Sequence, residues 1–226
     1  MVDEEEISFV RSRLDFWDRL TGAERDRLAR AISKSRFAKG TSLRSSDSEC
    51  LGVLVVRSGE LRTFIRSEDG REVTLYRLGP GEVCVLSASC VLNSITFDVS
   101  IDATKDAEVF RIGIAAFNEI IASNVWAENF SLKNALERFS DVMWAVEQIL
   151  FMRFDARLAI FLLDESAKAA EGEIRATHDE IARYVGSARE VVSRMLKSFE
   201  TEGIVETSRG SIRVLDRPAL KRLVGA

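Results

Sequence analysis

The sequence contains little histidine, cysteine or proline: its 226 residues include one histidine, three cysteines and two prolines. The single histidine, His178, excludes a metal centre that needs several imidazole ligands. The cysteines, Cys50, Cys84 and Cys90, form no Cys-x-x-Cys pair, and they are too few for an iron–sulfur cluster held by four thiolates. We therefore expect no metal site and no disulfide framework, and at least two of the thiols should be small buried apolar groups.

The sequence also lacks a long apolar run and a basic leader. No run approaches the roughly 18 apolar residues that a membrane-spanning helix needs, and the first six residues, Met1-Val2-Asp3-Glu4-Glu5-Glu6, are acidic where a secretory signal would be basic. We expect a cytoplasmic protein with no membrane partner. Hydrophobic residues make up 46% and charged residues 30% of the chain, which is typical of a folded globular protein.

The N-terminal half, residues 1–114, combines helices with many short strands. Residues 7–35 show helical periodicity, and Thr21-Gly22-Ala23-Glu24 forms a capping box inside that stretch. Glu68-Asp69-Gly70 predicts a hairpin because Asp-Gly tolerates positive φ. Many short strands at close spacing favour an antiparallel, jelly-roll-like double-stranded β-roll. The expected strands are residues 51–56, 61–65, 73–78, 83–86, 97–101 and 109–112.

Residues 115–150 predict one long helix with apolar side chains every seven residues on two adjoining rows. This is the a and d pattern of a coiled coil, so we expect residues 115–152 to form the dimerisation helix of a homodimer. An amphipathic helix that packs on its own domain is the alternative, and Trp126, Phe130, Met143 and Trp144 widen the apolar face in that direction. The predicted dimer interface consists of Leu132, Ala135, Phe139, Val142, Val146 and Ile149.

The last block, residues 153–226, has the pattern of a winged helix-turn-helix. Thr177-His178-Asp179-Glu180 and Ser187-Ala188-Arg189-Glu190 are two further capping boxes, each opening a short helix, and Gly186 lies between the helices. Two short strands then flank Ser208-Arg209-Gly210 and form the wing. The fold class is therefore α+β: a β-roll, a long helix and a winged helix-turn-helix.

The charge distribution supports a DNA-binding unit at the C-terminus. The whole chain carries 32 Lys and Arg against 36 Asp and Glu, a formal net charge of −4. Residues 173–226 carry ten basic and eight acidic residues, so this block is net +2 and the remainder net −6. An acidic total thus hides a mildly basic C-terminal unit, as expected where attraction to phosphate supplies non-specific affinity.

Two sets of motifs resemble the Crp/Fnr family of bacterial transcription regulators. One set is Gly59-Glu60-Leu61, Glu68-Asp69-Gly70-Arg71-Glu72-Val73 and Leu78-Gly79-Pro80-Gly81-Glu82 in the roll; the other is Ile181-Ala182 followed by Gly186-Ser187-Ala188-Arg189-Glu190-Val191-Val192-Ser193-Arg194. The resemblance covers nearly the whole chain. It implies a cyclic-nucleotide-binding-like β-roll, a dimerisation helix and a winged helix-turn-helix that binds DNA and regulates transcription.

Arg189, Glu190 and Arg194 are the residues expected to read base edges. They span about 140° of a helix face, and Arg can bind guanine O6 and N7 while Glu accepts from cytosine N4. The resemblance gives them a palindromic, TGTGA-like site in double-stranded DNA. The alternative is a solvated face, with Arg189 and Glu190 only capping the helix. Supporting contacts are predicted for Ser187 and Ser193 with phosphates, and for Val191 with a thymine methyl unless it only packs. Arg209 and Arg213 in the wing are predicted to contact the DNA backbone, with a solvated side chain as the alternative for either.

The roll departs from the pattern of the family's cyclic-nucleotide binders. In those proteins a Gly-Glu turn precedes a second acidic residue that holds the ribose, and an Arg-Ser/Thr-Ala triplet holds the cyclic phosphate. Here the second acidic residue is missing after Gly81-Glu82, and Phe97-Asp98 stand in place of Arg-Ser. A carboxylate in place of a guanidinium repels phosphate, so we expect an effector other than cyclic AMP. The candidate effector pocket comprises Glu82, Cys84, Ser87, Cys90, Phe97 and Asp98.

Several functions of the roll stay open at this point. The main hypothesis is an unknown small-molecule effector that binds between the roll and the long helix, with RNA polymerase as a further partner if the protein is an activator. The alternatives are a constitutive DNA-binding dimer with a degenerate, structural roll, and a haem or thiol redox sensor that uses Cys84 or Cys90. We expect no enzyme, because the roll has no histidine, nucleophile motif or metal-ligand set.

Overall fold

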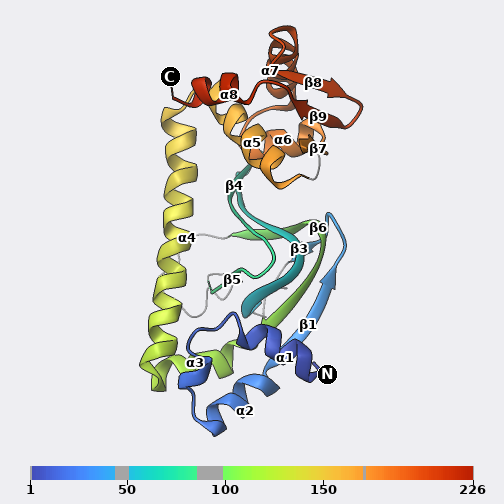
Figure 1. Cartoon of the computed structure of the whole chain (residues 1–226). Helices are drawn as coiled ribbons and strands as arrows, with labels where there is room; N and C mark the ends of the chain where they lie inside the picture. The colour runs from blue at the N-terminus through green and yellow to red at the C-terminus, as the bar shows by residue number, and fades with distance from the viewer. Residues whose placement is uncertain (1, 44–50, 86–98, 170–171, 226) are drawn as a thin grey trace. The chain divides into compact units, whose positions relative to one another are not determined.

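The computed structural model describes residues 2–43, 51–85, 99–169 and 172–225, and these form two compact units (Figure 1). The first unit comprises Met1–Ile65 and Leu75–Met143, and the second comprises Arg66–Thr74 and Trp144–Ala226. The boundary between them falls inside the long helix α4 (Val125–Phe151).

The first unit begins with two short helices and a 3₁₀ turn: α1 (Glu4–Arg11), η1 (Trp17–Arg19) and α2 (Gly22–Arg30). The capping box predicted at Thr21 and Glu24 is confirmed, since the Glu24 amide donates to the Thr21 hydroxyl and the Thr21 amide donates to the Glu24 carboxylate. The expected helix over residues 7–35 is wrong at its C-terminal end. The chain leaves the helix at Ala31 and enters strand β1, which pairs with β6 over its whole length.

The sheet of the first unit has six strands and confirms the β-roll. The strands are β1 (Ile32–Phe37), β2 (Ser42–Leu43), β3 (Val53–Arg66), β4 (Glu72–Leu78), β5 (Val83–Cys84) and β6 (Ser100–Ile112). The order is β1-β6-β3-β4, with β2 on β6 and β5 on β3. β3 continues through both of the strands expected at residues 51–56 and 61–65, and β6 through parts of those expected at 97–101 and 109–112. Irregular pairing with β6 between Val56 and Leu61 lets β3 continue without a turn.

Side chains of the roll alternate between two cores, as the pleat requires. Val53 and Val55 of β3 pack with the N-terminal helices, with Phe110 and with Phe117. Leu54 and Val56 point to the other face, into a cluster formed by residues of β4, β5 and β6. This second cluster comprises Leu43, Leu54, Val56, Leu61, Leu75, Tyr76, Leu78, Cys84, Ile101, Ala103, Ala107 and Val109.

The single helix expected over residues 115–150 is divided into α3 (Ile114–Ser123) and α4. The physical reason is Asn124, whose side-chain oxygen accepts from the backbone amides of Trp126 and Ala127 at 3.1 and 3.3 Å. The Asn124 side chain therefore caps the start of α4, although the helical periodicity of the sequence continues through this position.

The second unit has the winged helix-turn-helix order predicted from the sequence. Its elements are α5 (Phe154–Lys168), β7 (Glu173–Ile174), α6 (His178–Val185), α7 (Arg189–Thr201), β8 (Val205–Ser208), β9 (Ser211–Val214) and α8 (Arg217–Val224), together with the last part of α4. The strands form an antiparallel sheet in the order β7-β9-β8. Apolar residues of α5, α6, α7 and α8 meet above this sheet in one core that includes Leu158, Leu162, Ile181, Leu196 and Leu220.

Within the described residues, no helix is both long enough and apolar enough to span a membrane.

Candidate nucleic-acid interface and sensor site

The turn between α6 and α7 orients α7. Thr177 and Glu180 form the predicted capping box at the start of α6. At its end Gly186 adopts φ +61°, and the amides of Gly186 and Ser187 both donate to the carbonyl of Ala182. A left-handed residue at this position reverses the chain at little cost only when it is glycine. The short turn then leads directly into α7.

The third predicted capping box, Ser187 to Glu190, is wrong. α7 begins after Ala188, which is the N-cap residue and has no side chain that can accept a hydrogen bond. Because the helix starts one residue later than the box requires, the Glu190 carboxylate is not used to close the N-terminus. Glu190 is exposed instead, and its negative charge near a helix N-terminus is favourable without any cap.

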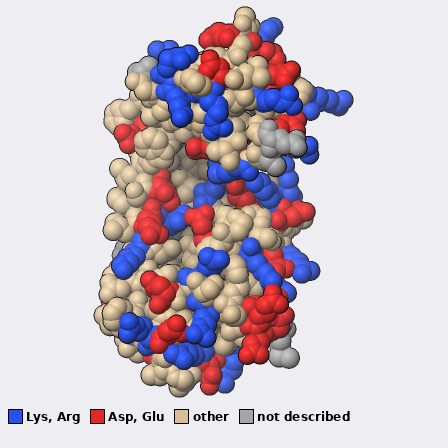
Figure 2. Space-filling model, viewed as in Figure 1, with Lys and Arg blue, Asp and Glu red and all other residues tan. Residues whose placement is uncertain are grey.

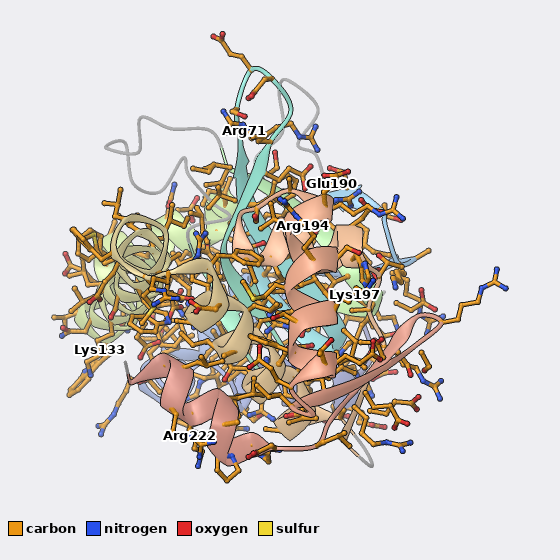
Figure 3. The ribbon with its side chains drawn as sticks, turned by 90° about the horizontal axis from the view of Figure 1, so that it is seen from above. Arg71, Lys133, Glu190, Arg194, Lys197 and Arg222 are labelled. Atoms are coloured by element: carbon orange, nitrogen blue, oxygen red, sulfur yellow. The ribbon has the colours of Figure 1, made fainter. Side chains whose placement is uncertain are left out.

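α7 presents a polar face opposite a buried apolar one. Its buried residues are Val192, Leu196 and Phe199. Figure 3 shows Glu190, Arg194 and Lys197 projecting from this helix in the view from above. The exposed polar residues of α7 are Arg189, Glu190, Ser193, Arg194 and Lys197, followed towards its C-terminal end by Ser198, Glu200 and Thr201.

The individual residues of the predicted interface differ in exposure. The Arg189 Nε lies 3.8 Å from the Asp179 Oδ2, and both side chains are more than half exposed, so this ion pair is weak and leaves the guanidinium accessible. Val191 and Ser187 are half-buried, which fits packing for Val191. Lys197 was not predicted, although its position seven residues after Glu190 places it on the same helix face.

The wing is held against α7 by Glu200. The Glu200 Oε1 accepts from the amide and the hydroxyl of Thr207 at 3.0 and 2.6 Å, and these hydrogen bonds hold the pKa of Glu200 below its usual value. Arg209 is exposed at the wing tip, next to Gly210 at φ +79°. Arg213, further along β9, pairs with Glu206 at 3.4 Å.

Positive and negative side chains are interspersed over the face seen in Figure 2.

The long helix α4 has an exposed apolar row. Leu132, Leu136, Phe139 and Met143 are between 48% and 67% exposed, and Leu150 continues the row at 65%. Their spacing alternates between four and three residues, the a and d spacing of a coiled coil. Of the predicted interface, Leu132 and Phe139 belong to this row and Ile149 is 39% exposed. Ala135, Val142 and Val146 are half-buried, and Val142 packs against the roll cluster. The interface stays a prediction.

The opposite face of α4, which packs on the roll, includes buried polar side chains among its apolar ones. Asn134 is buried, and its side-chain amide forms two hydrogen bonds with the backbone of residues 83–85. The Val85 amide donates to Oδ1 at 3.0 Å, and Nδ2 donates to the Val83 carbonyl at 2.9 Å. One turn later Arg138 bonds the Glu82 Oε1 at 3.2 Å. Sequence periodicity did not reveal these residues, because polar residues on a helix are normally assigned to solvent.

Two residues of the predicted effector pocket are described. The Glu82 Oε2 accepts from the Gly79 amide at 2.6 Å, so Glu82 joins the preceding turn to Arg138. Cys84 is fully buried, and its Sγ lies 3.6 Å from the hydroxyl of Tyr76. Burial, followed by the neighbouring thiol, raises the pKa of Tyr76 above its usual value. Ser87, Cys90, Phe97 and Asp98, together with Cys50, lie outside the described residues.

In the described part of the chain, no cluster of three or more His, Cys, Asp or Glu side chains could hold a metal ion.

Comparison with known proteins agrees with this geometry. Residues 34–124 match the cyclic nucleotide-binding domain, and residues 156–223 match the Crp-like helix-turn-helix domain. The transcriptional regulatory protein btr of Bordetella pertussis is 27% identical over 198 residues, covering 84% of this chain and 80% of the relative. The cAMP-activated global transcriptional regulator Vfr of Pseudomonas aeruginosa is 24% identical over 188 residues, covering 80% and 88%.

A solved structure of a protein assigned to the Crp/Fnr family, from Eubacterium rectale, is 40% identical. It superposes with a TM-score of 0.88, covering 95% of this chain and 100% of that one. The β-roll, the helix-turn-helix and this likeness over almost the full length show that the chain belongs to the Crp/Fnr family of DNA-binding transcriptional regulators and is not an enzyme.

Proposed function

We propose that the protein is a homodimer that binds a palindromic, TGTGA-like operator through α7 and is gated by a small-molecule effector other than cyclic AMP. The observation that carries the proposal is the exposed face of α7, where Glu190 and Arg194 stand opposite a fully apolar buried face and Arg189 is exposed at the first residue of the helix. Two arginines and one glutamate in this arrangement offer donors to guanine and an acceptor to cytosine.

The exposed row on α4 supports the homodimer. A monomer that left Leu132, Leu136, Phe139 and Met143 in water would expose an unusually continuous apolar stripe. A second copy of α4 covers the same row on both partners, because a two-fold interface uses the same surface twice. Two copies of α7 then read half-sites roughly 34 Å apart, which matches a palindrome.

The effector is proposed to bind in the roll beside α4. Polar contacts from Asn134 and Arg138 connect this helix to the segment that follows Gly81-Glu82. An occupant that shifted this segment would therefore also shift the dimer helix, which is a population shift between two packings. If the protein is an activator, it also contacts RNA polymerase.

Fluorescence anisotropy with a labelled palindromic duplex tests the proposal. Wild-type protein should bind a TGTGA-containing palindrome at least tenfold more tightly than a shuffled duplex of equal length, and Arg194→Ala should lose most of that ratio. Arg27→Ala is the matched control, because it removes an exposed arginine of α2 that pairs with Glu119 and should leave DNA binding unchanged. Equal affinity of wild-type protein for both duplexes would overturn the assignment of α7.

A further inference from the structure

Arg138 is a charged side chain buried between α4 and the roll. The residue is 9% exposed, and its guanidinium lies 5.4 Å from the centre of the Tyr76 ring. Burying a guanidinium is unfavourable unless its donors are satisfied. The partners that the structure gives it are the Glu82 Oε1 at 3.2 Å, on Nη2, and the Asp141 Oδ2 at 3.0 Å, on Nη1.

One donor of this guanidinium is left over. The Nε of Arg138 is buried and has no acceptor among the residues that the structure describes. The N–H groups of Nε and Nη2 point in parallel along one edge of an arginine, and this edge fits the two oxygens of a carboxylate or phosphate. Glu82 occupies only the Nη2 half of it, at a distance long for a charge-assisted bond.

We propose that the Nε–Nη2 edge of Arg138 binds the oxoanion of the effector, a carboxylate or a phosphate group, in exchange for the Glu82 carboxylate. The inference rests on the proposed function, because it names the chemical class of the ligand that gates the dimer. It places the anion-binding guanidinium on α4, in a chain whose roll has no arginine between Arg77 and Arg111.

Burial and charge favour this exchange. The Glu82 side chain is 42% exposed, so it can turn into solvent and be hydrated after it leaves Arg138. The guanidinium remains in a less polar environment, where its attraction to an anion is stronger than at the surface. Asp141 stays on Nη1, where its Oδ2 lies 3.0 Å away, so the incoming anion replaces Glu82 and does not add to it.

The exchange also provides a link to α4. In the described structure Glu82 bonds both the Gly79 amide and Arg138, so it ties the turn before β5 to the helix. An effector that replaced Glu82 would release this tie and would substitute its own anion as the contact with α4. The ligand would then contact α4 at the position where, in the protein alone, the Glu82 carboxylate contacts it.

The test is NMR of the full-length protein with ¹⁵N-labelled arginine side chains. Inorganic phosphate and acetate are titrated separately at constant ionic strength, with sodium chloride as the balancing salt. The Arg138 Nε–H signal, assigned by its loss in Arg138→Lys, reports the site directly. We expect a saturable shift of this signal. A response to acetate alone identifies a carboxylate ligand, a response to phosphate alone identifies a phosphate, and a response to both supports the shared chemistry.

Two variants make the result specific. Glu82→Gln keeps an oxygen that can accept from Gly79 but removes the competing charge, so both anions should bind about threefold more tightly if the pair has the usual strength of a partly exposed ion pair. Lys133→Gln, on the exposed side of the same helix, removes a cation at another position and should change nothing.

The absence of a saturable shift with either anion would overturn the inference. So would a shift with the same affinity in wild-type protein and Glu82→Gln, since that is the behaviour of an adventitious ion only. Neither result affects operator binding, which the anisotropy experiment measures separately.

Discussion

Replacing Leu136 by alanine should dissociate the dimer without unfolding the chain. Leu136 is 67% exposed on α4, so its truncation costs the first unit little packing. Full burial of a leucine is worth about 1.5–3 kcal/mol, and covering the exposed two thirds is therefore worth roughly 1–2 kcal/mol. Each side chain is buried once per protomer, so the dimer should lose about 2–4 kcal/mol. The dimer dissociation constant should then rise roughly 30- to 700-fold.

Sedimentation velocity over a concentration series measures this constant. Lys133→Ala, at an exposed polar position three residues away, is the control and should behave as wild type. Val142→Ala distinguishes the exposed row from the interface predicted from the sequence, which contains Val142. Because Val142 packs against the roll cluster, its truncation should lower the melting temperature and should raise the dimer dissociation constant less than Leu136→Ala does. A dimer that tolerates Leu136→Ala but is dissociated by Val142→Ala would refute the reasoning.

Three further predictions concern readout, the N-terminal helix and the roll. Glu190→Ala should relax discrimination at one cytosine and cost about 1–3 kcal/mol on the cognate operator, with little change on other sequences; an equal loss on every duplex would show that Glu190 reads no base. Glu6→Gln should lower the melting temperature at neutral pH, because hydrogen bonds from Lys34 and the Asp3 amide hold the pKa of Glu6 below its usual value. Since that stability is lost as pH falls through the lowered pKa, the two melting curves should converge below about pH 4, and a constant difference would contradict this origin. Gly59→Ala should be far more destabilising in thermal melts than Gly70→Ala: both glycines have φ +82°, but a Cβ on Gly59 would lie 2.1 Å from the Asp106 carbonyl oxygen while one on Gly70 meets nothing within 4 Å. Equal losses would mean that backbone strain alone, about 1–3 kcal/mol, accounts for both.

Local signals predicted the second unit better than the first. The winged helix-turn-helix is built from short-range devices: a capping box at Thr177, a left-handed glycine at Gly186 and a hairpin glycine at Gly210. Each acts within a few residues, so sequence patterns contain the information. The failure at Ser187 is also local: N-cap preference ranks Ser187 far above Ala188, yet α7 begins one residue later, after Ala188.

Errors in the first unit arise from long-range pairing. Residues 32–37 look helical in isolation, but Ile32 pairs with Ile112 and Phe37 with Ala107, more than 60 residues away. Pairing partners so distant leave no trace in local periodicity, and tertiary context overrides propensity. The same limit applies to α4, where heptad spacing predicts a dimer helix but does not show which polar residues face the roll. Asn134 and Arg138 contact Val83 and Glu82, which lie about 50 residues earlier in the chain, so only the three-dimensional structure identifies their role.

The central claim is that base edges are read by α7 in a dimer, and one binding measurement tests it most directly. Operator affinity is measured for wild-type protein and Glu190→Ala on two palindromes. The two duplexes differ only in one G·C base pair of each half-site, the pair whose cytosine Glu190 is predicted to contact. Wild-type protein should prefer the cognate duplex by at least tenfold, and Glu190→Ala should bind both with similar affinity. If Glu190→Ala retained the full preference, or if the wild type had none, α7 would not read sequence and the account would be wrong.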